Sequence, residues 1–279
     1  MEPVMARKMW RTLEPYHGLI YFAPEAASAY EALGVTGRDG YFASRAAAMG
    51  AVPAEVVIAT FFNFNPDLVR HAIPAAWEAA SPHQLVEARA GAADAALRRA
   101  LGDVVDGAEV ARAAELARVA ADGCSPVGRA LYAGQSSLPW PTAPHVALWH
   151  AISLLREHRG DGHIAALVDA RLSGLDALIF HAASGDVPRV ALQTSRGWPD
   201  EAWDAAVARL VDRGLVDAEG GFTDDGAALR QHIEDRTDAL ALAPWQGLGE
   251  DGCDELRGLV RPLSKAIVEG GTFGFRPSA

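Results

Sequence analysis

The sequence predicts a mainly α-helical protein. Apolar residues recur at helical spacing through most of residues 13–172, and stretches with the alternation of a half-buried strand are almost absent. Short stretches rich in glycine, proline or asparagine separate the helical segments, which is typical of turns between helices. The expected helices are residues 13–33, 42–49, 56–62, 68–77, 85–101, 104–121, 146–155 and 164–172.

Length and composition bound the class of protein. The chain has 279 residues, 50% hydrophobic and 22% charged, which is enough for one large or two ordinary domains. No apolar run approaches the ~18 residues that cross a bilayer, and the N-terminus lacks a signal-peptide pattern. Cys124 and Cys253 are too few for a disulfide framework or a structural zinc site. We therefore expect a cytoplasmic protein that contacts no membrane.

The segment 203–242 has the order of elements found in a winged helix. Apolar residues recur at helical spacing after Trp203, and Gly214 is placed to end that helix. A short apolar pair and a glycine-rich tip follow, and Thr223 can then N-cap a long helix. Over about residues 185–270 the pattern resembles a winged-helix module of the MarR type, which implies a scaffold of the kind that binds DNA.

The charges of this segment argue against DNA as a partner. Surfaces that contact phosphates usually carry Arg, Lys and polar residues. Here the expected recognition helix and wing are acidic, and the whole chain has a formal net charge of −11. A local basic patch from Arg189, Arg196 and His181 is the alternative. The acidic residues are Asp200, Glu201, Asp204 and Asp212 in the helix, beside Arg209 and Arg213, and Asp217, Glu219, Asp224 and Asp225 at the wing.

Weak internal similarity suggests that the two halves are diverged copies. On this hypothesis the fold is a tandem of degenerate winged-helix, MarR-like modules with long helices and short β-wings. Residues 1–134 form the first module, 135–143 a proline-rich linker and 144–279 the second module. Chance similarity in an alanine-rich helical chain is the alternative. The matching positions are Asp39-Gly40 with Asp161-Gly162, Gly50 with Gly174, Pro74 with Pro199, and Pro15 with Pro144.

Four further runs resemble a group of uncharacterised actinobacterial proteins described as SalK-like or helix-turn-helix. The resemblance extends over nearly the whole chain and implies a helical fold, but the group has no agreed activity. An actinobacterial origin also agrees with abundant alanine and with only two lysines, Lys8 and Lys265. The runs are residues 17–25 (HGLIYFAPE), 44–50 (SRAAAMG), 59–64 (ATFFNF) and 156–163 (REHRGDGH).

A first candidate site lies near the N-terminus. His17, Tyr21 and Glu25 are spaced four residues apart, so an unbroken helix would place them on one face, although Pro24 can bend it. An imidazole, a phenol and a carboxylate in one row suit a polar ligand, a haem iron or a proton relay. The alternative is a helix whose rings pack in the core while the carboxylate faces solvent.

A second candidate is the charged run 156–163, with Trp149 and His150 upstream. Its spacing matches no zinc motif such as H-E-x-x-H, so we predict a polar ligand site without a metal. In a purely structural alternative, Asp161 caps a following helix and the arginines pair with acids. The ionisable residues are Arg156, Glu157, His158, Arg159, Asp161 and His163.

Aromatic residues form a third candidate. Tyr41, Phe61, Phe62, Phe64 and Trp77 surround Asn63 in the first half, and such rings either fill a core or line a pocket for a planar molecule. Nucleophile-elbow, phosphate-loop and dinucleotide fingerprints are missing from the sequence, which weighs against hydrolases, NTPases and nicotinamide-dependent enzymes.

Three functions follow from these observations. The leading hypothesis is a small-molecule-binding protein on a winged-helix scaffold that has lost DNA binding, with an aromatic or polycyclic ligand. The others are a MarR-like ligand-responsive regulator and an enzyme of specialised metabolism with His, Tyr and Glu as acid–base groups. Haem or another chromophore is the cofactor considered, and the chain is expected as a pseudo-symmetric monomer or a homodimer. The predicted ligand-binding residues are His17, Tyr21, Arg45, Phe62, Asn63, Phe64, Trp149, His150, Glu157, His158 and His163.

Overall fold

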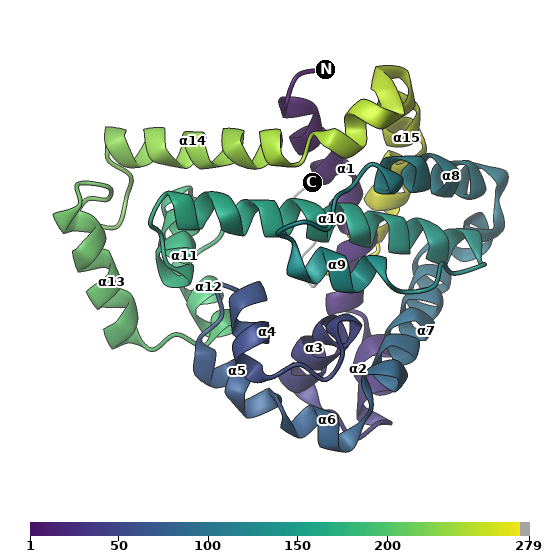
Figure 1. Ribbon diagram of the computed structural model, residues 1–279, viewed down its shortest axis with the longest axis horizontal. Helices are drawn as coiled ribbons and strands as arrows, with labels where there is room; N and C mark the ends of the chain where they lie inside the picture. Colours follow the sequence, from purple (N-terminus) through teal and green to yellow (C-terminus); the bar gives the residue numbers. More distant parts are fainter. Residues whose placement is uncertain (274–279) are drawn as a thin grey trace.

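The computed structural model describes residues 1–273, and this part of the chain is helical with one isolated antiparallel bridge, Val216 to Phe222 (Figure 1). The predicted α class is confirmed. The helices are α1 (Val4–Gly18), α2 (Pro24–Glu31), α3 (Gly37–Ala46), α4 (Ala54–Thr60), α5 (Pro66–Ala72), α6 (Ala75–Ala79), α7 (Pro82–Leu101), α8 (Ala108–Asp122), α9 (Ala130–Ser136), α10 (Pro144–Asp169), α11 (Gly174–Ala183), α12 (Arg189–Arg196), α13 (Asp200–Asp212), α14 (Asp224–Leu240) and α15 (Ala243–Glu269), with short 3-10 helices η1 (Leu19–Tyr21), η2 (Ala47–Met49) and η3 (Gly102–Asp106).

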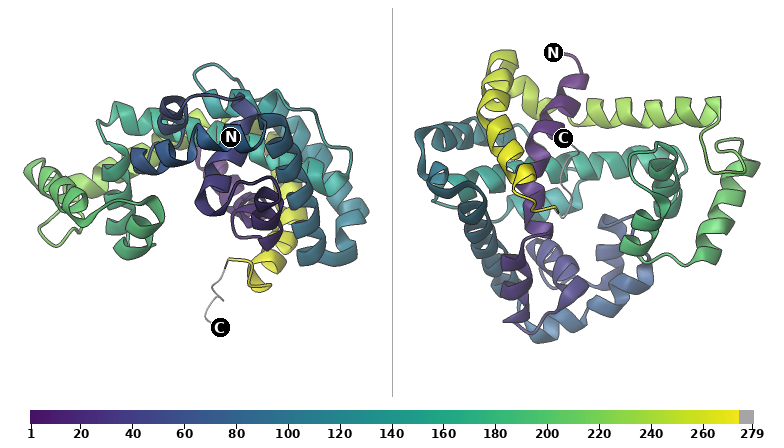
Figure 2. Two further views of the ribbon diagram at one scale, coloured as in Figure 1. Left: turned by 90° about the horizontal axis from the view of Figure 1, so that it is seen from below. Right: turned by 180° about the vertical axis from the view of Figure 1, so that it is seen from behind.

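Two hydrophobic cores define two lobes. The first lobe has buried apolar residues from Ala6 to Leu155 and from Ala241 to Ile267, and the second lobe has them from Ala166 to Ile233. The long helices α10 and α14 run side by side between the lobes (Figures 1 and 2). The cores therefore meet within α10 rather than at residues 135–143, and α15 returns to the first lobe, where it packs on α1 and α8.

The central helix α10 corrects one expectation. Two helices with a glycine turn at residues 160–162 were expected, but α10 is continuous over 26 residues. It is buried against both lobes, and that packing outweighs the cost of about 1 kcal/mol that each glycine adds in a helix. Asp161 consequently caps no helix that follows it in sequence; its Oδ2 accepts a hydrogen bond, 3.0 Å long, from Tyr132 N in the first turn of α9. The proposed match between Asp39-Gly40 and Asp161-Gly162 is therefore wrong.

The N-terminal segment also differs from the expected structure. A single helix over residues 13–33 would align His17, Tyr21 and Glu25, but α1 ends at Gly18, η1 carries Tyr21 and α2 begins at Pro24. Proline suits the first position of a helix because the N–H it lacks would have no helical partner there. The break turns Glu25 away from the other two residues, and it forms an ion pair with Arg99 of α7.

The second lobe follows the predicted order of elements. Gly197, with φ of +71°, turns the chain from α12 into α13, and Gly214, with φ of +69°, follows α13. The bridge between Val216 and Phe222 takes the place of the expected wing strands. Thr223 caps α14 as predicted, since its Oγ1 accepts a hydrogen bond from Gly226 N at 3.1 Å.

The described helices differ in length and in apolar content. Among them, no single helix is long and apolar enough to cross a bilayer. One pair, Gly37–Met49 with Ala54–Thr60, meets the length and composition criteria only when both helices are taken together, and it is bent by 94°.

Candidate functional site

Three arginines converge inside the first lobe. Arg45 comes from α3, Arg89 from α7 and Arg156 from α10, and all three guanidinium groups lie within 5.7 Å of the Tyr21 ring centre. Arg45 and Arg89 are only 6% and 5% exposed. We call these three arginines, with Tyr21 and Glu157, the arginine cluster.

Glu157 is the acidic member of this cluster. Arg45 Nη2 donates to both of its carboxylate oxygens, at 2.7 and 2.9 Å, and Arg156 Nη1 lies 3.3 Å from Oε2. Burial alone would raise the pKa of the Glu157 carboxyl, but the charges of Arg45 and Arg156 outweigh it and lower that pKa. Both members of the Arg45–Glu157 pair are therefore charged at neutral pH.

Arg89 differs from its two neighbours because no carboxylate lies within ion-pair distance of it among residues 1–273. Its nearest polar partners are Tyr21 OH at 3.4 Å and Ser44 Oγ at 3.5 Å, and its Nε has no hydrogen-bond partner. The guanidinium instead lies over the rings of Tyr21 and Trp149, each centred 5.3 Å away. The charge of Arg89 acts on Glu157 from a distance, but Arg89 forms no ion pair of its own, and a buried charge without a direct partner costs several kcal/mol. The cluster is therefore short of negative charge.

A hydrogen-bonded row adjoins the arginines. Tyr21 OH lies 2.7 Å from His17 Nε2, and His17 Nδ1 lies 2.8 Å from Ser153 Oγ, which donates to Trp149 O. Because the serine proton is used on Trp149 O, Ser153 accepts from His17 Nδ1–H and His17 Nε2 accepts from the phenol. Burial, with help from the arginine charges, lowers the pKa of His17, and burial raises that of Tyr21. Both side chains are therefore neutral at pH 7.

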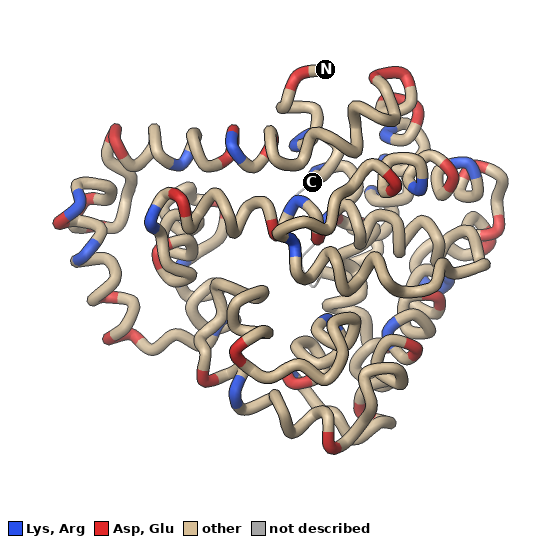
Figure 3. Tube along the Cα trace, viewed as in Figure 1, with Lys and Arg blue, Asp and Glu red and all other residues tan. Residues whose placement is uncertain are grey.

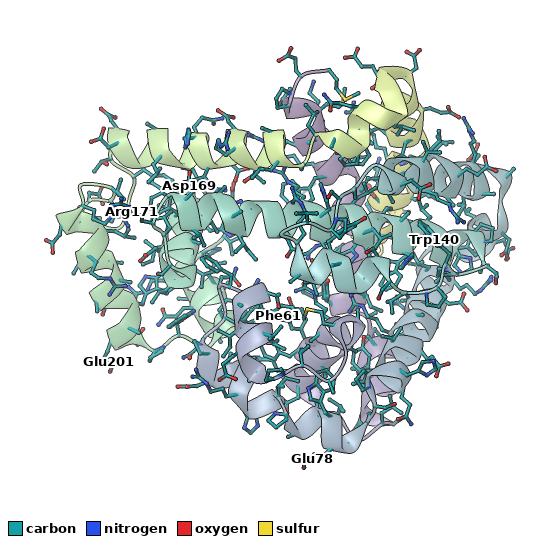
Figure 4. All side chains as sticks on the ribbon, viewed as in Figure 1. Phe61, Glu78, Trp140, Asp169, Arg171 and Glu201 are labelled. Carbon is teal, nitrogen blue, oxygen red and sulfur yellow. The ribbon has the colours of Figure 1, made fainter. Side chains whose placement is uncertain are left out.

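An aromatic turn, residues 61–65, lies between the arginine cluster and the second lobe. Phe61, labelled in Figure 4, faces the Arg45 guanidinium at 4.5 Å, and Phe64 faces that of Arg196 at 4.6 Å. Asn63 O accepts a hydrogen bond from Trp198 Nε1 at 3.0 Å, and Asn65 Nδ2 donates to the carbonyl of Gly197 at 2.8 Å.

The same turn approaches α11 closely. Phe62 has φ of +21°, a rare conformation for a residue with a side chain, and its carbonyl lies against Gly174. A Cβ at position 174 would come within 1.8 Å of Phe62 O. Only glycine fits there, so the contact between the two lobes depends on a residue without a side chain.

The structure places eight of the eleven predicted ligand-binding residues at the arginine cluster or in the aromatic turn. Those in or beside the arginine cluster are His17, Tyr21, Arg45, Trp149 and Glu157, and Phe62, Asn63 and Phe64 belong to the aromatic turn. The other three predicted residues, all on α10, do not join them. His150 packs on Trp140, His158 on Tyr132, and His163 Nδ1 lies 2.9 Å from Thr237 Oγ1. Burial lowers the pKa of each of these three histidines to about 4.

Some residues of the site were missed or assigned a different role. Arg89 was not singled out, although it lies between Leu85 and Ala92 on the apolar face of the expected helix 85–101. An arginine among alanines and leucines at helical spacing is the signal that could have identified it. Arg156 was included in the charged run 156–163 but not among the predicted ligand-binding residues, and Ser153 was hidden in an apolar run.

In the described part of the chain, no group of three or more His, Cys, Asp or Glu side chains could hold a metal ion. Cys124 and Cys253 are free, and burial raises the pKa of their thiols to about 12 and about 11.

The residues of the basic patch considered for DNA contact have partners on the protein itself. Arg189 Nη2 lies 2.9 Å from Asp204 and 3.4 Å from Asp200 on α13, and Arg196 stacks on Phe64. Burial also lowers the pKa of His181, which favours its neutral form. Acidic residues instead mark the start of α13 and the tip that follows it (Figure 3).

The order of elements in the second lobe defines a class of protein. A short helix, a tight glycine turn and a second helix, followed by a bridged tip and a long helix, form a helix-turn-helix unit in α12 and α13. The chain matches the model of a helix-turn-helix family over residues 6–274 and belongs to that family. The match covers both lobes. No curated protein and no solved structure matches the chain.

Proposed function

We propose that this helix-turn-helix protein binds a small anionic molecule with a planar apolar part at the arginine cluster. The observation that carries the proposal is Arg89, a buried guanidinium that has no acidic partner in residues 1–273 and lies between two aromatic rings. A carboxylate or phosphate would complete the charge balance, because guanidinium groups bind both through paired hydrogen bonds. The rings of Tyr21, Trp149 and Phe61 suit a flat ligand body.

The proposal includes a winged-helix scaffold of the MarR type in the second lobe that no longer binds DNA. The basic residues of α13 and its C-cap have partners on their own lobe: Arg209 lies 3.6 Å from Asp176, and Arg213 Nη1 donates to Arg171 O at 3.0 Å. The acids of the helix stay on the surface, where phosphates would be repelled. The test is fluorescence anisotropy with genomic DNA fragments, for which we expect no salt-sensitive binding.

A ligand-responsive regulator is the second candidate function. The aromatic turn 61–65 favours it because the turn contacts Arg45 on one side and the α12–α13 turn on the other. A ligand that displaced Phe61 would therefore act on the helix-turn-helix unit through five consecutive residues. This candidate requires DNA binding that changes when the ligand is added, which the same anisotropy measurement would detect.

The ligand site is tested with a charged and a neutral probe of the same shape. Isothermal titration calorimetry should detect 1-naphthoate binding and no binding of 1-naphthamide. Arg89→Met should weaken naphthoate affinity about tenfold to a hundredfold, the range for a lost charge-assisted hydrogen bond. The matched control is Arg118→Met, because Arg118 also lies over a tryptophan, at 4.5 Å from Trp140, but is exposed.

Two results would contradict the site. Equal binding of naphthoate and naphthamide would show that the charge is not recognised, and full affinity in Arg89→Met would place the probe elsewhere. Stability gives an independent check. Removing an unpaired buried charge with an apolar side chain of similar length should leave the ligand-free protein as stable as before or more stable. Ligand binding is then lost without loss of fold.

A further inference from the structure

The second lobe contains a cavity that the proposed function does not use. It has a volume of about 570 Å³ and lies between α11, α13 and the tip after α13. Ile179, Val207 and Val211 contribute apolar surface to it. The volume falls within the range of about 300–1,000 Å³ that is usual for sites of small organic ligands.

The polar lining of this cavity is acidic. Asp204, Asp212 and Glu219 face a single basic residue, Arg189, which already lies 2.9 Å from Asp204 and 3.4 Å from Asp200. Asp212 and Glu219 have no cation within 4.0 Å in residues 1–273. The cavity therefore joins an apolar surface to an excess of negative charge that its own residues do not neutralise.

We infer that this cavity binds a small organic cation with an apolar body. The apolar lining accounts for the body, and Asp212 and Glu219 account for the charge, because an opposite charge at the rim favours entry and orientation of the ligand. The site is separate from the arginine cluster: it lies in the other lobe and has the opposite sign of charge. The cavity in the second lobe binds a cation, whereas the arginine cluster binds an anion.

The test uses two ions of the same size and shape. Calorimetric titration with tetraphenylphosphonium should show binding that weakens as salt is added, and tetraphenylborate should not bind. The double variant Asp212→Asn/Glu219→Gln should lower the affinity for the phosphonium about threefold to tenfold, as expected for two exposed ion pairs. The matched control is Glu201→Gln, since Glu201 lies on the same helix but points away from the molecule (Figure 4).

A second variant fills the space. Ala208 is exposed at the cavity wall, so Ala208→Trp should keep the fold and abolish phosphonium binding. Equal affinity for both ions, unchanged affinity in the double variant, or full affinity in Ala208→Trp would each overturn the inference. So would binding of an arginine-rich nonapeptide together with no binding of the phosphonium, because the occupant would then be a polypeptide. Arg89→Met should leave phosphonium binding unchanged, which separates this site from the proposed anion site.

Discussion

The two lobes each hold an imbalance of charge, and they hold it in opposite surroundings. The first lobe gathers two buried arginines, Arg45 and Arg89, and the half-buried Arg156 around the buried carboxylate of Glu157, whereas the second exposes its acids along α13 and the tip. Water screens the second group at little cost, but the first depends on the contacts inside the protein. The formal net charge of −11 is a property of the whole chain and describes neither region, because the arginine cluster holds more positive than negative groups.

The largest difference in stability is expected when one glutamate is replaced in each lobe. Glu157→Gln removes the carboxylate that pairs with buried Arg45 and leaves Arg156 with Glu14 as its remaining acidic partner, so unfolding free energy should fall by about 3–5 kcal/mol. Glu219→Gln at the exposed tip should change it by less than about 0.5 kcal/mol. Chemical denaturation of both variants measures the difference.

Similar losses of unfolding free energy in the two variants would contradict the difference between the lobes. A small effect of Glu157→Gln alone would mean that the arginines find other partners, which removes the argument for an incomplete cluster. Addition of naphthoate gives a further check, because an anion near Arg89 should restore part of the stability lost in Glu157→Gln.

Acid should destabilise the protein through α10. The pKa of buried His150 and His158 is about 4 in the folded chain, well below its usual value, so the unfolded chain binds protons first as pH falls below about 6.5. Asp161 opposes this, because burial raises the pKa of its carboxyl to about 6 and protonation there favours the fold. His163 adds to the histidine effect. The net loss between pH 7 and pH 5 should be about 4 kcal/mol.

The measurement is urea denaturation across this pH range, compared with His158→Phe. That variant removes one of the groups that must become charged, so its stability should depend less steeply on pH than that of the natural sequence. A flat profile in the natural sequence would show that these histidines are not held neutral by burial.

Sequence patterns predicted the local features of the fold better than its long-range contacts. Thr223 and Gly214 were correctly placed because capping and left-handed turns depend on residues close in the chain. The continuity of α10 was missed, because its glycines would favour a break without the packing of both lobes around them. Glu25 was misplaced for a related reason: Pro24 starts a helix instead of bending one.

The candidate site shows the same limit. His17 and Tyr21 were paired correctly from their spacing, and their side chains lie 2.7 Å apart in the structure. Arg89 joins them from 68 residues away, and that contact depends on how α7 packs, which no local pattern contains. His150 and His158 were included because they are close in sequence to Glu157. His158 follows Glu157 directly, so the helix turns it to another face, whereas His150 lies two turns earlier on α10 and packs on Trp140.

The contact between Gly174 and the aromatic turn can be disrupted by adding one methyl group at Gly174. In Gly174→Ala the new Cβ would come within 1.8 Å of Phe62 O, so the aromatic turn must move, at a cost of about 1–3 kcal/mol. Gly91→Ala is the matched control, because a Cβ at this exposed helical position meets nothing within 4 Å. It should stabilise the protein by up to about 1 kcal/mol. Thermal denaturation that moved both variants in the same direction would contradict the close contact.

The variant with the smallest expected effect tests whether the arginine cluster and the helix-turn-helix unit are coupled. Trp198→Phe removes the hydrogen bond to Asn63 O and keeps a ring at the turn, so stability should fall by about 1 kcal/mol. Hydrogen exchange should then speed up in α12 and α13 and stay unchanged in α15, which packs on α1 and α8. Naphthoate affinity should also change slightly, because Asn63 lies two residues from Phe61 and its contact with Arg45. If exchange in α12 and α13 changed while the ligand affinity stayed the same, the aromatic turn would join the lobes mechanically without linking their functions, and the regulator hypothesis would lose its support.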